Sequence, residues 1–166
     1  MPKYPVIVFE GIETSGKSTH INKLSKYLKT INRKFIKVRE PGGSIYSEAI
    51  RKLMLNNKSK FNHITDLMLI MASRSENIDK ILKKNYGKKI ILIDRFIDST
   101  LAYQHYGMGI DKKLINKLNK FILNGFKPNY TFINIVNKKN MKLRFSRRST
   151  LNKYDKFNYS LYNKIQ

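Results

Sequence analysis

The sequence of 166 residues contains no cysteine, which excludes both a disulfide framework and a thiolate metal site. It also lacks an apolar run long enough for a bilayer, because its first hydrophobic cluster, residues 6–9, is far too short to span one. No basic leader precedes this cluster, so we expect no export signal. These absences predict a soluble protein of the cytoplasm without a membrane partner.

Acidic residues are scarce: the chain has 11 of them against 34 Lys and Arg, and its formal charge is +23. Such an excess is typical of proteins that bind nucleic acid, because Lys and Arg neutralise phosphates. However, 26 of the basic residues are Lys, spread along the chain among many Asn and Ile, a composition that AT-rich coding sequence produces. We favour this compositional explanation and expect no nucleic-acid partner. The Arg residues are more informative, because all but Arg33 lie in or beside the motifs described below.

The chain has no repeat of fixed period and no linker rich in Pro or Ser, so we expect a single domain over residues 1–166. Short runs rich in Ile, Val and Phe alternate with segments of helical period. The runs predict strands at residues 6–10, 35–39, 89–94 and 130–136. This alternation predicts a three-layer α/β fold with a central parallel sheet, helices on both faces, and ligands at the carboxyl ends of the strands.

Three helical segments carry apolar stripes, which we expect to be buried against the sheet or a neighbouring helix. The stripe residues are Ile21, Leu24, Leu28 and Ile31 in the first segment, Leu67, Ile70, Met71, Ile78 and Leu82 in the second, and Leu114, Leu118, Phe121 and Ile122 in the third. The third stripe therefore assigns Phe121 to the protein core.

Directly after the first expected strand, residues 11–18 read Gly-Ile-Glu-Thr-Ser-Gly-Lys-Ser, which matches the P-loop pattern G-x-x-x-x-G-K-[ST]. The glycines allow backbone N–H groups to close round phosphates at a helix N-terminus, where Lys17 reaches the β- and γ-phosphates. A plain glycine turn is the alternative, but a chance match to the whole pattern is rare. We expect ATP to bind at Gly11, Ile12, Glu13, Thr14, Ser15, Gly16, Lys17, Ser18 and Thr19.

The third expected strand ends in Asp94 and Arg95, which a parallel sheet would bring beside the P-loop. We expect Asp94 and the Ser18 hydroxyl to hold Mg²⁺, which binds oxygen ligands, as the cofactor of ATP. An acidic residue at the end of an apolar strand is common in α/β proteins, so this expectation depends on the P-loop. Arg95 would point to the same phosphates.

Arginines also occur outside the P-loop region. Arg74 falls on an apolar helical stripe, where it needs an acceptor, either a ligand or an internal carboxylate such as Glu40 or Asp98. Arg144 and Arg148 are spaced i, i+4 in a segment of helical character, and two guanidinium groups on one helical face can clamp a transferring phosphoryl group. A solvated basic face is the alternative, which the P-loop makes less attractive.

These motifs resemble those of the thymidylate kinase family, the dTMP kinases among the P-loop nucleotide kinases, and of its bacterial type. The resemblance covers essentially the whole chain. It rests on residues 9–18 for the phosphate loop, residues 39–43 for the family's R-E-P-G-G segment, and residues 94–104 for its D-R-[FYH]-x-x-S-x-x-A-[FY]-Q signature. The last of these motifs is highly specific.

The resemblance implies an acceptor site for dTMP. Thr100 and Gln104 would contact the base, and Arg74 its O4 edge. Tyr103 would lie against the deoxyribose, where a 2′-hydroxyl would clash, and Ile70 stands where family members usually have a Phe that stacks on the base. The implied substrate-binding residues are Glu13, Arg39, Pro41, Arg51, Ile70, Arg74, Arg95, Thr100, Tyr103 and Gln104.

The resemblance also implies a lid over about residues 144–156, in which Lys153 stands where the family usually has an Arg. The implied catalytic residues are Lys17, Arg95, Arg144, Arg148 and Lys153. Family members continue beyond the position of Gln166 through a fifth strand and a last helix, so we expect these elements and part of the adenine site to be missing. A homodimer is implied as well.

We therefore expect the reaction Mg²⁺-ATP + dTMP → ADP + dTDP, in dTTP biosynthesis. The acceptor phosphate is itself the nucleophile, so no strong general base is needed. Two alternatives stay open. A deoxynucleoside kinase of the same fold would need a carboxylate such as Glu40 to accept a proton from a 5′-hydroxyl. A nucleic-acid-binding protein with an idle P-loop would explain the positive charge through its partner.

Overall fold

The fold is that of a computed structural model, which describes residues 2–148, 153–156 and 159–166. Four strands form one sheet in the order β2-β3-β1-β4. They are β1 (Val6–Glu10), β2 (Phe35–Arg39), β3 (Ile90–Asp94) and β4 (Tyr130–Ile133). Each neighbouring pair is parallel, so all four strands end at the same edge of the sheet. The predicted parallel sheet is confirmed.

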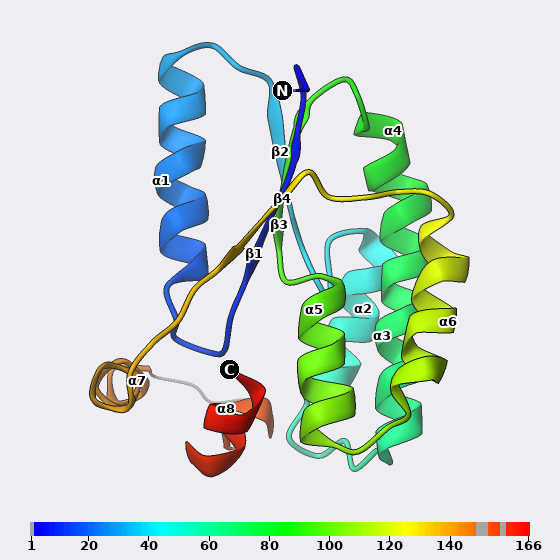
Figure 1. The fold of residues 1–166 in the computed structure, drawn as a ribbon, viewed down its shortest axis with the longest axis vertical. Coiled ribbons are helices and arrows are strands. Elements are labelled where there is room, and N and C mark those ends of the chain that lie inside the picture. The colour runs from blue at the N-terminus through cyan, green and yellow to red at the C-terminus, as the bar shows by residue number, and fades with distance from the viewer. Residues whose placement is uncertain (1, 149–152, 157–158) are drawn as a thin grey trace.

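Helices connect the strands and follow the last one. They are α1 (Lys17–Thr30), α2 (Ile45–Leu55), α3 (His63–Asn77), α4 (Lys83–Asn85), α5 (Ile97–Thr100), α6 (Lys112–Leu123), α7 (Lys138–Ser146) and α8 (Tyr159–Ile165). π-helical turns over Ile78–Leu82 and Leu101–Gly107 extend α3 and α5, and a 3₁₀ turn over Lys153–Lys156 precedes α8. Figure 1 shows α1 on one face of the sheet and α2 to α6 on the other, which confirms the three layers. Within the described ranges, no helix has the length and apolar character needed to cross a membrane.

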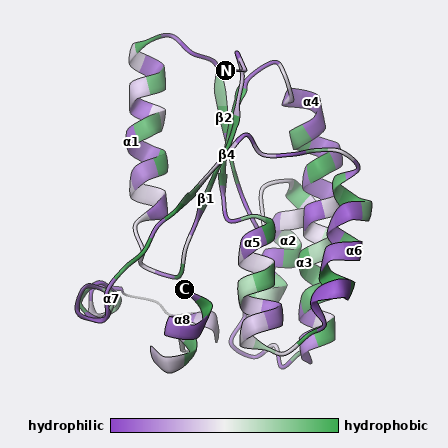
Figure 2. Cartoon of the chain, viewed as in Figure 1, coloured by the Kyte–Doolittle hydropathy of each residue, from purple (hydrophilic) through white to green (hydrophobic). Residues whose placement is uncertain are grey.

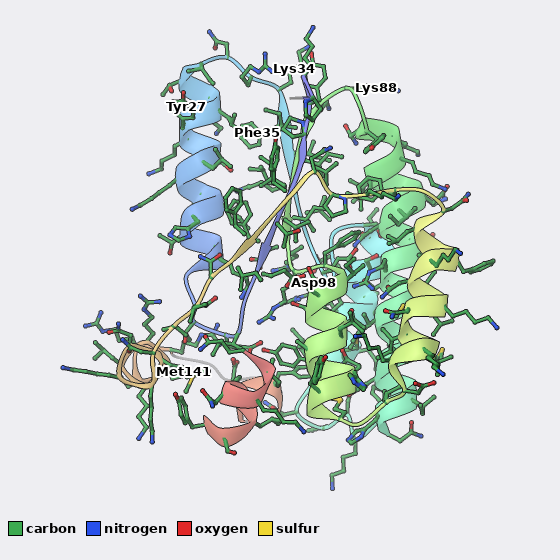
Figure 3. All side chains as sticks on the ribbon, in the orientation of Figure 1. Tyr27, Lys34, Phe35, Lys88, Asp98 and Met141 are labelled. Atoms are coloured by element: carbon green, nitrogen blue, oxygen red, sulfur yellow. The ribbon has the colours of Figure 1, made fainter. Side chains whose placement is uncertain are left out.

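Each face of the sheet has its own core, because successive side chains of a strand point to opposite faces. One core contains Val6, Val8, Val38, Ile78, Leu82, Ile91, Ile93, Phe96 and Phe126. The other contains Phe9, Ile21, Leu28, Ile90 and Leu92. Phe35, which points toward α1 in Figure 3, packs against this second core. The central strands β1 and β3 are covered on both faces, which explains their Ile- and Val-rich sequences. Hydrophobic and hydrophilic colours both occur in the sheet in Figure 2, because the outer strands β2 and β4 are more exposed.

Two strands are shorter than the sequence pattern predicts. The pattern predicts a strand through Val136, but β4 ends at Ile133, which pairs with Glu10, the last residue of β1; the backbone of Val136 has a different partner. Its N–H donates to the side-chain oxygen of Gln166 over 2.9 Å, and its carbonyl accepts from the side-chain nitrogen over 3.2 Å. At β3, the N–H of Lys89 bonds to the carbonyl of Asn85, so the strand begins one residue later.

The predicted helical stripes are buried or half-buried except at two positions. Ile31 follows the last residue of α1 and is 45% exposed. Phe121 is 83% exposed, so its predicted place in the core is wrong. Helix α6 buries Ile115, and Phe121 is six residues farther along, a rotation of about 600° that leaves it some 120° away from the buried direction.

Candidate active site

The carboxyl ends of β1 and β3 face a cavity of about 930 Å³. Residues 13–19, which comprise most of the P-loop and the first turn of α1, line it together with Asp94 and Arg95 at the end of β3. Arg144 of α7 and Arg148 beyond α7 line it too. The structure therefore brings the phosphate-loop residues, the two candidate metal ligands and three candidate catalytic arginines to one cavity.

The loop after β1 has the backbone of an anion site. Gly11 has a φ of +137°, and a Cβ there would lie 2.3 Å from the carbonyl oxygen of Asn134, so only glycine fits. Gly16, with a φ of +101°, precedes α1 and leaves the first N–H groups of that helix without an intrahelical partner. The hydroxyl oxygens of Thr14 and Ser15 are buried and form no hydrogen bond with other described residues. Free donors of this kind at a helix N-terminus suit phosphate groups.

Lys17 lies within this loop as a buried cation. Its Nζ donates to the carbonyl oxygens of Gly11 and Ile12, both at 2.9 Å. Burial lowers the pKa of Lys17 to about 8; the charge of Arg95 adds to this effect, and Asp94 opposes it. Phosphate groups would supply the counter-charge that Lys17 lacks. Gly11 and Ile12 are not among the lining residues of the cavity, and these two carbonyl oxygens connect them to Lys17.

Ser18 and Asp94, the expected Mg²⁺ ligands, lie together at the cavity. The Ser18 hydroxyl donates to Oδ2 of Asp94 over 3.1 Å. Among the residues that the structure describes, no group of three or more His, Asp or Glu could hold a metal ion alone. The pair therefore fits a Mg²⁺ ion that takes its other ligands from water and nucleotide phosphates, which is the usual mode for this ion.

Arg95 occupies a tight turn after β3, with a φ of +66° that is unusual for a residue other than glycine. Its Nη2 donates to Oε1 of Glu13 over 2.7 Å, and its guanidinium lies 5.1 Å from the centre of the Tyr103 ring. The Tyr103 hydroxyl donates to the other oxygen of Glu13. Burial raises the pKa of Tyr103 well above its ordinary value, so the phenol keeps its proton. The three side chains form one hydrogen-bonded cluster.

Glu10 holds this turn in place, a role that the sequence motifs do not reveal. Its buried carboxylate accepts from the backbone N–H of Phe96 at 2.8 Å and of Ser99 at 3.2 Å, and also from the Ser99 hydroxyl. A carboxylate at these positions caps the first turn of α5. The signal in the sequence is weak, because it consists only of an acidic residue at the end of an apolar strand.

A second cavity, of about 100 Å³, shares part of its lining with the first: Glu13, Glu40, Arg51 and Arg95 line both. Its other lining residues are Pro41, Met54, Leu55, Ile70, Arg74, Phe96, Ser99, Thr100, Tyr103, Gln104 and Tyr154. All the candidate substrate-binding residues except Arg39 therefore line this cavity. Arg39 lines only the first cavity and forms an ion pair with Glu48 at 2.8 Å.

Arg74 is 1% exposed, and its guanidinium N–H groups all meet acceptors inside the protein. Its Nε donates to Glu40 over 2.7 Å, so the internal ion pair considered for this residue is present. Its Nη2 donates to the carbonyl of Phe96 and to Thr100, at 3.1 and 2.9 Å. Its Nη1 bonds to Asn119 of α6, and it also contacts the Met71 sulfur at 3.9 Å, which is the weakest of these interactions.

Gln104 leaves one polar atom free at the second cavity. Its side chain is 1% exposed, and its Oε1 has no hydrogen-bond partner among the described residues. A buried oxygen of this kind is unfavourable unless a ligand supplies a donor. Met54 and Leu55 join Ile70 in the apolar part of the wall. Sequence reasoning missed these two, because nothing distinguishes them from core residues at the end of a helix.

The segment after β4 differs from its sequence prediction. Helix α7 ends at Ser146, so Arg148 lies beyond it, and the prediction that Arg144 and Arg148 share a helical face is wrong. Arg148 instead pairs with Asp155 of the 3₁₀ turn, and its guanidinium lies 5.5 Å from the centre of the Phe145 ring. Arg144 reaches the P-loop, where its Nη1 donates to the carbonyl of Thr14 over 2.7 Å.

Tyr154, in the same 3₁₀ turn, connects this segment to the second cavity. Its hydroxyl donates to the buried Asp66 of α3 over 3.4 Å, and its ring lies edge-on to Tyr103 with 6.3 Å between centroids. The sequence signal for a role of Tyr154 at the site was its position in the expected lid. The prediction for Lys153 concerns a side chain outside the described residues, as do the predictions for residues 149–152 of the lid.

A parallel sheet with a phosphate-binding loop after its first strand, a buried lysine in that loop and a Ser–Asp pair beside it define a P-loop nucleotide-binding protein. Comparisons with known proteins identify the family within this class. The family model described as thymidylate kinase matches residues 9–166. The chain therefore belongs to the thymidylate kinase family.

Individual relatives agree with this assignment. The thymidylate kinase of Sulfurihydrogenibium sp. (strain YO3AOP1) is 46% identical over 129 residues, which are 76% of this chain and 63% of the relative. That of Wolbachia sp. subsp. Brugia malayi (strain TRS) is 37% identical over 163 residues, 96% of this chain and 77% of the relative. The crystal structure of thymidylate kinase from Ehrlichia chaffeensis matches with a TM-score of 0.76 at 40% identity, covering 86% of this chain and 78% of that one. The matched region thus spans a little under two thirds of the Sulfurihydrogenibium protein.

Proposed function

We propose that the protein transfers the γ-phosphoryl group of ATP to dTMP, giving ADP and dTDP for dTTP biosynthesis. The observation that carries this proposal is the junction of the two cavities. Glu13, Arg51 and Arg95 line both of them, so two cationic side chains lie where a donor in the first cavity and an acceptor in the second would meet. In-line transfer between phosphates requires such positioning and charge stabilisation more than it requires covalent chemistry.

The first cavity would take the ATP phosphates. Backbone N–H groups of the P-loop and the first turn of α1 would bind the phosphate oxygens, and Lys17 would neutralise charge on the γ-phosphate. Ser18 and Asp94 would hold Mg²⁺, which would supply positive charge to offset the negative charge of the phosphates. Arg144, already in contact with the P-loop, and Arg148 would stabilise charge on the transferred group.

The second cavity would take dTMP, with its phosphate toward Arg51 and Arg95. The free Oε1 of Gln104 supports this orientation, because N3–H of thymine would supply the donor that this oxygen lacks. A base carbonyl near Arg74 would displace the weak contact of Nη1 with the Met71 sulfur while the other hydrogen bonds of Arg74 persist. Ile70 would cover the base with aliphatic area only.

A deoxynucleoside kinase is the rival, because Glu40 lines both cavities and burial raises its pKa. Its carboxylate is paired with Arg74, however, and a nucleoside has no phosphate to place beside Arg51 and Arg95. A coupled assay of ADP release over dTMP, dUMP, UMP and thymidine separates the two. We expect turnover with dTMP and none with thymidine. Turnover with thymidine, or equal ADP release without any acceptor, would contradict the proposal.

A homodimer and a cytoplasmic location belong to the same proposal. The support for the dimer is an apolar face on two adjacent helices, α2 and α3, that no other described residue covers. Its exposed side chains are Ile45 (87%), Tyr46 (66%), Leu53 (47%), Ile64 (49%) and Met68 (41%). A second copy would bury this face. We further propose that residues 1–166 act as one domain with a lid over residues 144–156.

A further inference from the structure

The loop of residues 40–44, which leads from β2 to α2 (Figure 1), contributes to the wall of the second cavity, and we call it the acceptor loop. Glu40 and Pro41 line the cavity, and Glu40 pairs with Arg74. The carbonyl of Pro41 accepts from Nη1 of Arg51 over 2.7 Å. The acceptor loop therefore contacts two of the arginines that line the proposed dTMP site.

The backbone of the acceptor loop takes a conformation that its glycines permit but do not impose. Gly42 and Gly43 have φ values of +120° and +113°, in the region that favours glycine. Glycine has the greatest conformational freedom of all residues, so other groups must hold this path in place. One of them is Glu48 of α2, whose Oε1 accepts from the N–H of Gly43 over 2.7 Å.

Helix α3 holds the acceptor loop through two side chains, Ser73 and Asn77. The Oγ of Ser73 accepts from the N–H of Gly42 over 3.1 Å. The Oδ1 of Asn77 accepts from the N–H of Ser44 over 3.0 Å, and its Nδ2 donates to the carbonyl of Gly42 over 2.5 Å. A Cβ on Gly43 would lie 2.8 Å from Oδ1 of Asn77, so the loop packs directly against this amide.

Asn77 is suited to this place because an amide carries a donor and an acceptor on one planar group. Ser73 and Asn77 are both 0% exposed, so water cannot replace their hydrogen bonds to the loop. They are four residues apart and therefore lie on the same side of α3, and Arg74 directly follows Ser73. One stretch of helix thus carries Arg74 and also holds the loop that supplies its partner Glu40.

Neither Asn77 nor Ser73 is among the lining residues of the two cavities, so their effect on a nucleotide would be indirect. On the basis of the proposed function, we infer that Asn77 is a positioning residue of the acceptor site. It holds the acceptor loop so that Arg51 meets the phosphate of dTMP and Arg74 meets its base. Ser73 assists through its single bond to the loop.

Steady-state kinetics and calorimetry on Asn77→Ala test this role. The kcat/KM for dTMP should fall, and the Kd of dTMP should rise, by at least about 10-fold, because small displacements of binding groups are costly. The KM for ATP should stay close to that of the parent, because the P-loop belongs to β1 and α1. Ser73→Ala removes one of the three bonds and should raise the Kd of dTMP by about 3-fold. It replaces Asn77→Ala in every measurement if that variant does not fold.

A double-mutant cycle with Arg51→Ala separates positioning from a purely structural role. If Asn77 acts through Arg51, the two substitutions together should weaken dTMP binding by less than the product of their separate effects. Leu28→Ala is the matched control, because Leu28 is a buried residue of α1 that is not among the lining residues of either cavity. It should lower the melting temperature and leave the Kd of dTMP close to that of the parent.

Unchanged dTMP affinity in a folded Asn77→Ala or Ser73→Ala protein would overturn the positioning role. So would an equal loss of ATP affinity, independent effects in the cycle with Arg51→Ala, or the same loss of dTMP affinity in Leu28→Ala. Each of these results leaves the proposed function in place, because the parent still binds and phosphorylates dTMP. Absence of dTMP binding and turnover in the parent would instead refute the proposed function, and the positioning role with it.

Discussion

At the level of single residues, Lys17 combines burial with positive charge. Its pKa in the folded, ligand-free protein, about 8, lies below its ordinary value of 10.5. Between these two pH values the unfolded chain binds a proton that the folded chain does not, so the contribution of Lys17 to stability increases as the pH rises through this window. Below it, the charged lysine destabilises the empty site and favours the binding of phosphate.

Lys17→Met should separate these effects. Near neutral pH, the ligand-free variant should be more stable than the parent by about 1 kcal/mol. Removing the cost of burying the charged ammonium should stabilise the protein more than the loss of its two hydrogen bonds destabilises it. This advantage should disappear near pH 10, and turnover should be absent throughout. Urea denaturation at both pH values, with an activity assay, checks the prediction. A variant that is less stable than the parent at neutral pH would contradict it.

Tyr103 is placed to exclude a ribose 2′-hydroxyl, since its ring lines the second cavity and is fixed by Glu13 and Arg95. The parent should therefore prefer dUMP to UMP, and Tyr103→Ala should reduce this preference by about 1–3 kcal/mol, the usual scale for one substrate group in a fitted pocket. Tyr103→Phe is the matched control, because it keeps the ring and should keep the preference. Ratios of kcat/KM for the two nucleotides provide the measurement, and equal use of both by the parent would refute the assignment.

At the level of elements, the central strands and α1 could be predicted because their patterns follow from physical requirements. A strand covered on both faces must be apolar throughout, as Ile90 to Ile93 are. The P-loop was predictable because Gly11 and Gly16 take backbone conformations that other residues avoid. The Asp94–Ser18 pair then followed from the parallel order of the strands.

Other features could not be predicted because they depend on contacts between distant residues. The backbone of Val136, expected in a strand, bonds to the side chain of Gln166, and Arg148 pairs with Asp155. The exposure of Phe121 depends on which side of α6 packs against α3. The apolar stripe in the sequence of α6 is wider than the side that is buried, so the stripe does not reveal which of its residues face α3. Glu40 was one of the acceptors considered for Arg74, but the further bonds of Arg74 to Phe96 and Thr100 appear only in three dimensions.

The segment around α7 leads to a prediction about the two arginines that it brings to the first cavity. Arg148→Ala should lower kcat by about 10³-fold and change the KM for dTMP far less, because a guanidinium at the transferred group acts mainly in the transition state. Arg147→Ala is the matched control, since Arg147 is the adjacent exposed arginine and does not line the cavity. Steady-state kinetics with a viscosity series checks that product release is not limiting. If Arg144→Ala and Arg148→Ala both left kcat unchanged, the segment would be a solvated basic face.

At the level of the whole molecule, the charge of +23 should make stability depend on salt. The acidic residues are largely consumed in internal contacts such as the Arg95–Glu13 and Arg74–Glu40 pairs, so the surface lysines mainly repel one another. Added sodium chloride should raise the free energy of unfolding, and more of the gain should occur at low concentration, where the screening length shortens most. Denaturant unfolding over a salt series measures this. Stability that falls with added salt would show that attractive pairs dominate.

The central claim is that the two cavities serve one reaction, and a bisubstrate ligand tests it most directly. Adenosine and thymidine joined by a 5′,5′-pentaphosphate chain would occupy both cavities at once. Calorimetry should show it binding at least about 10²-fold more tightly than ATP or dTMP alone, because the second contact becomes intramolecular. Lys17→Ala in the first cavity and Gln104→Ala in the second should each weaken this binding. An affinity no greater than that of ATP, or one that Gln104→Ala leaves unchanged, would contradict the account.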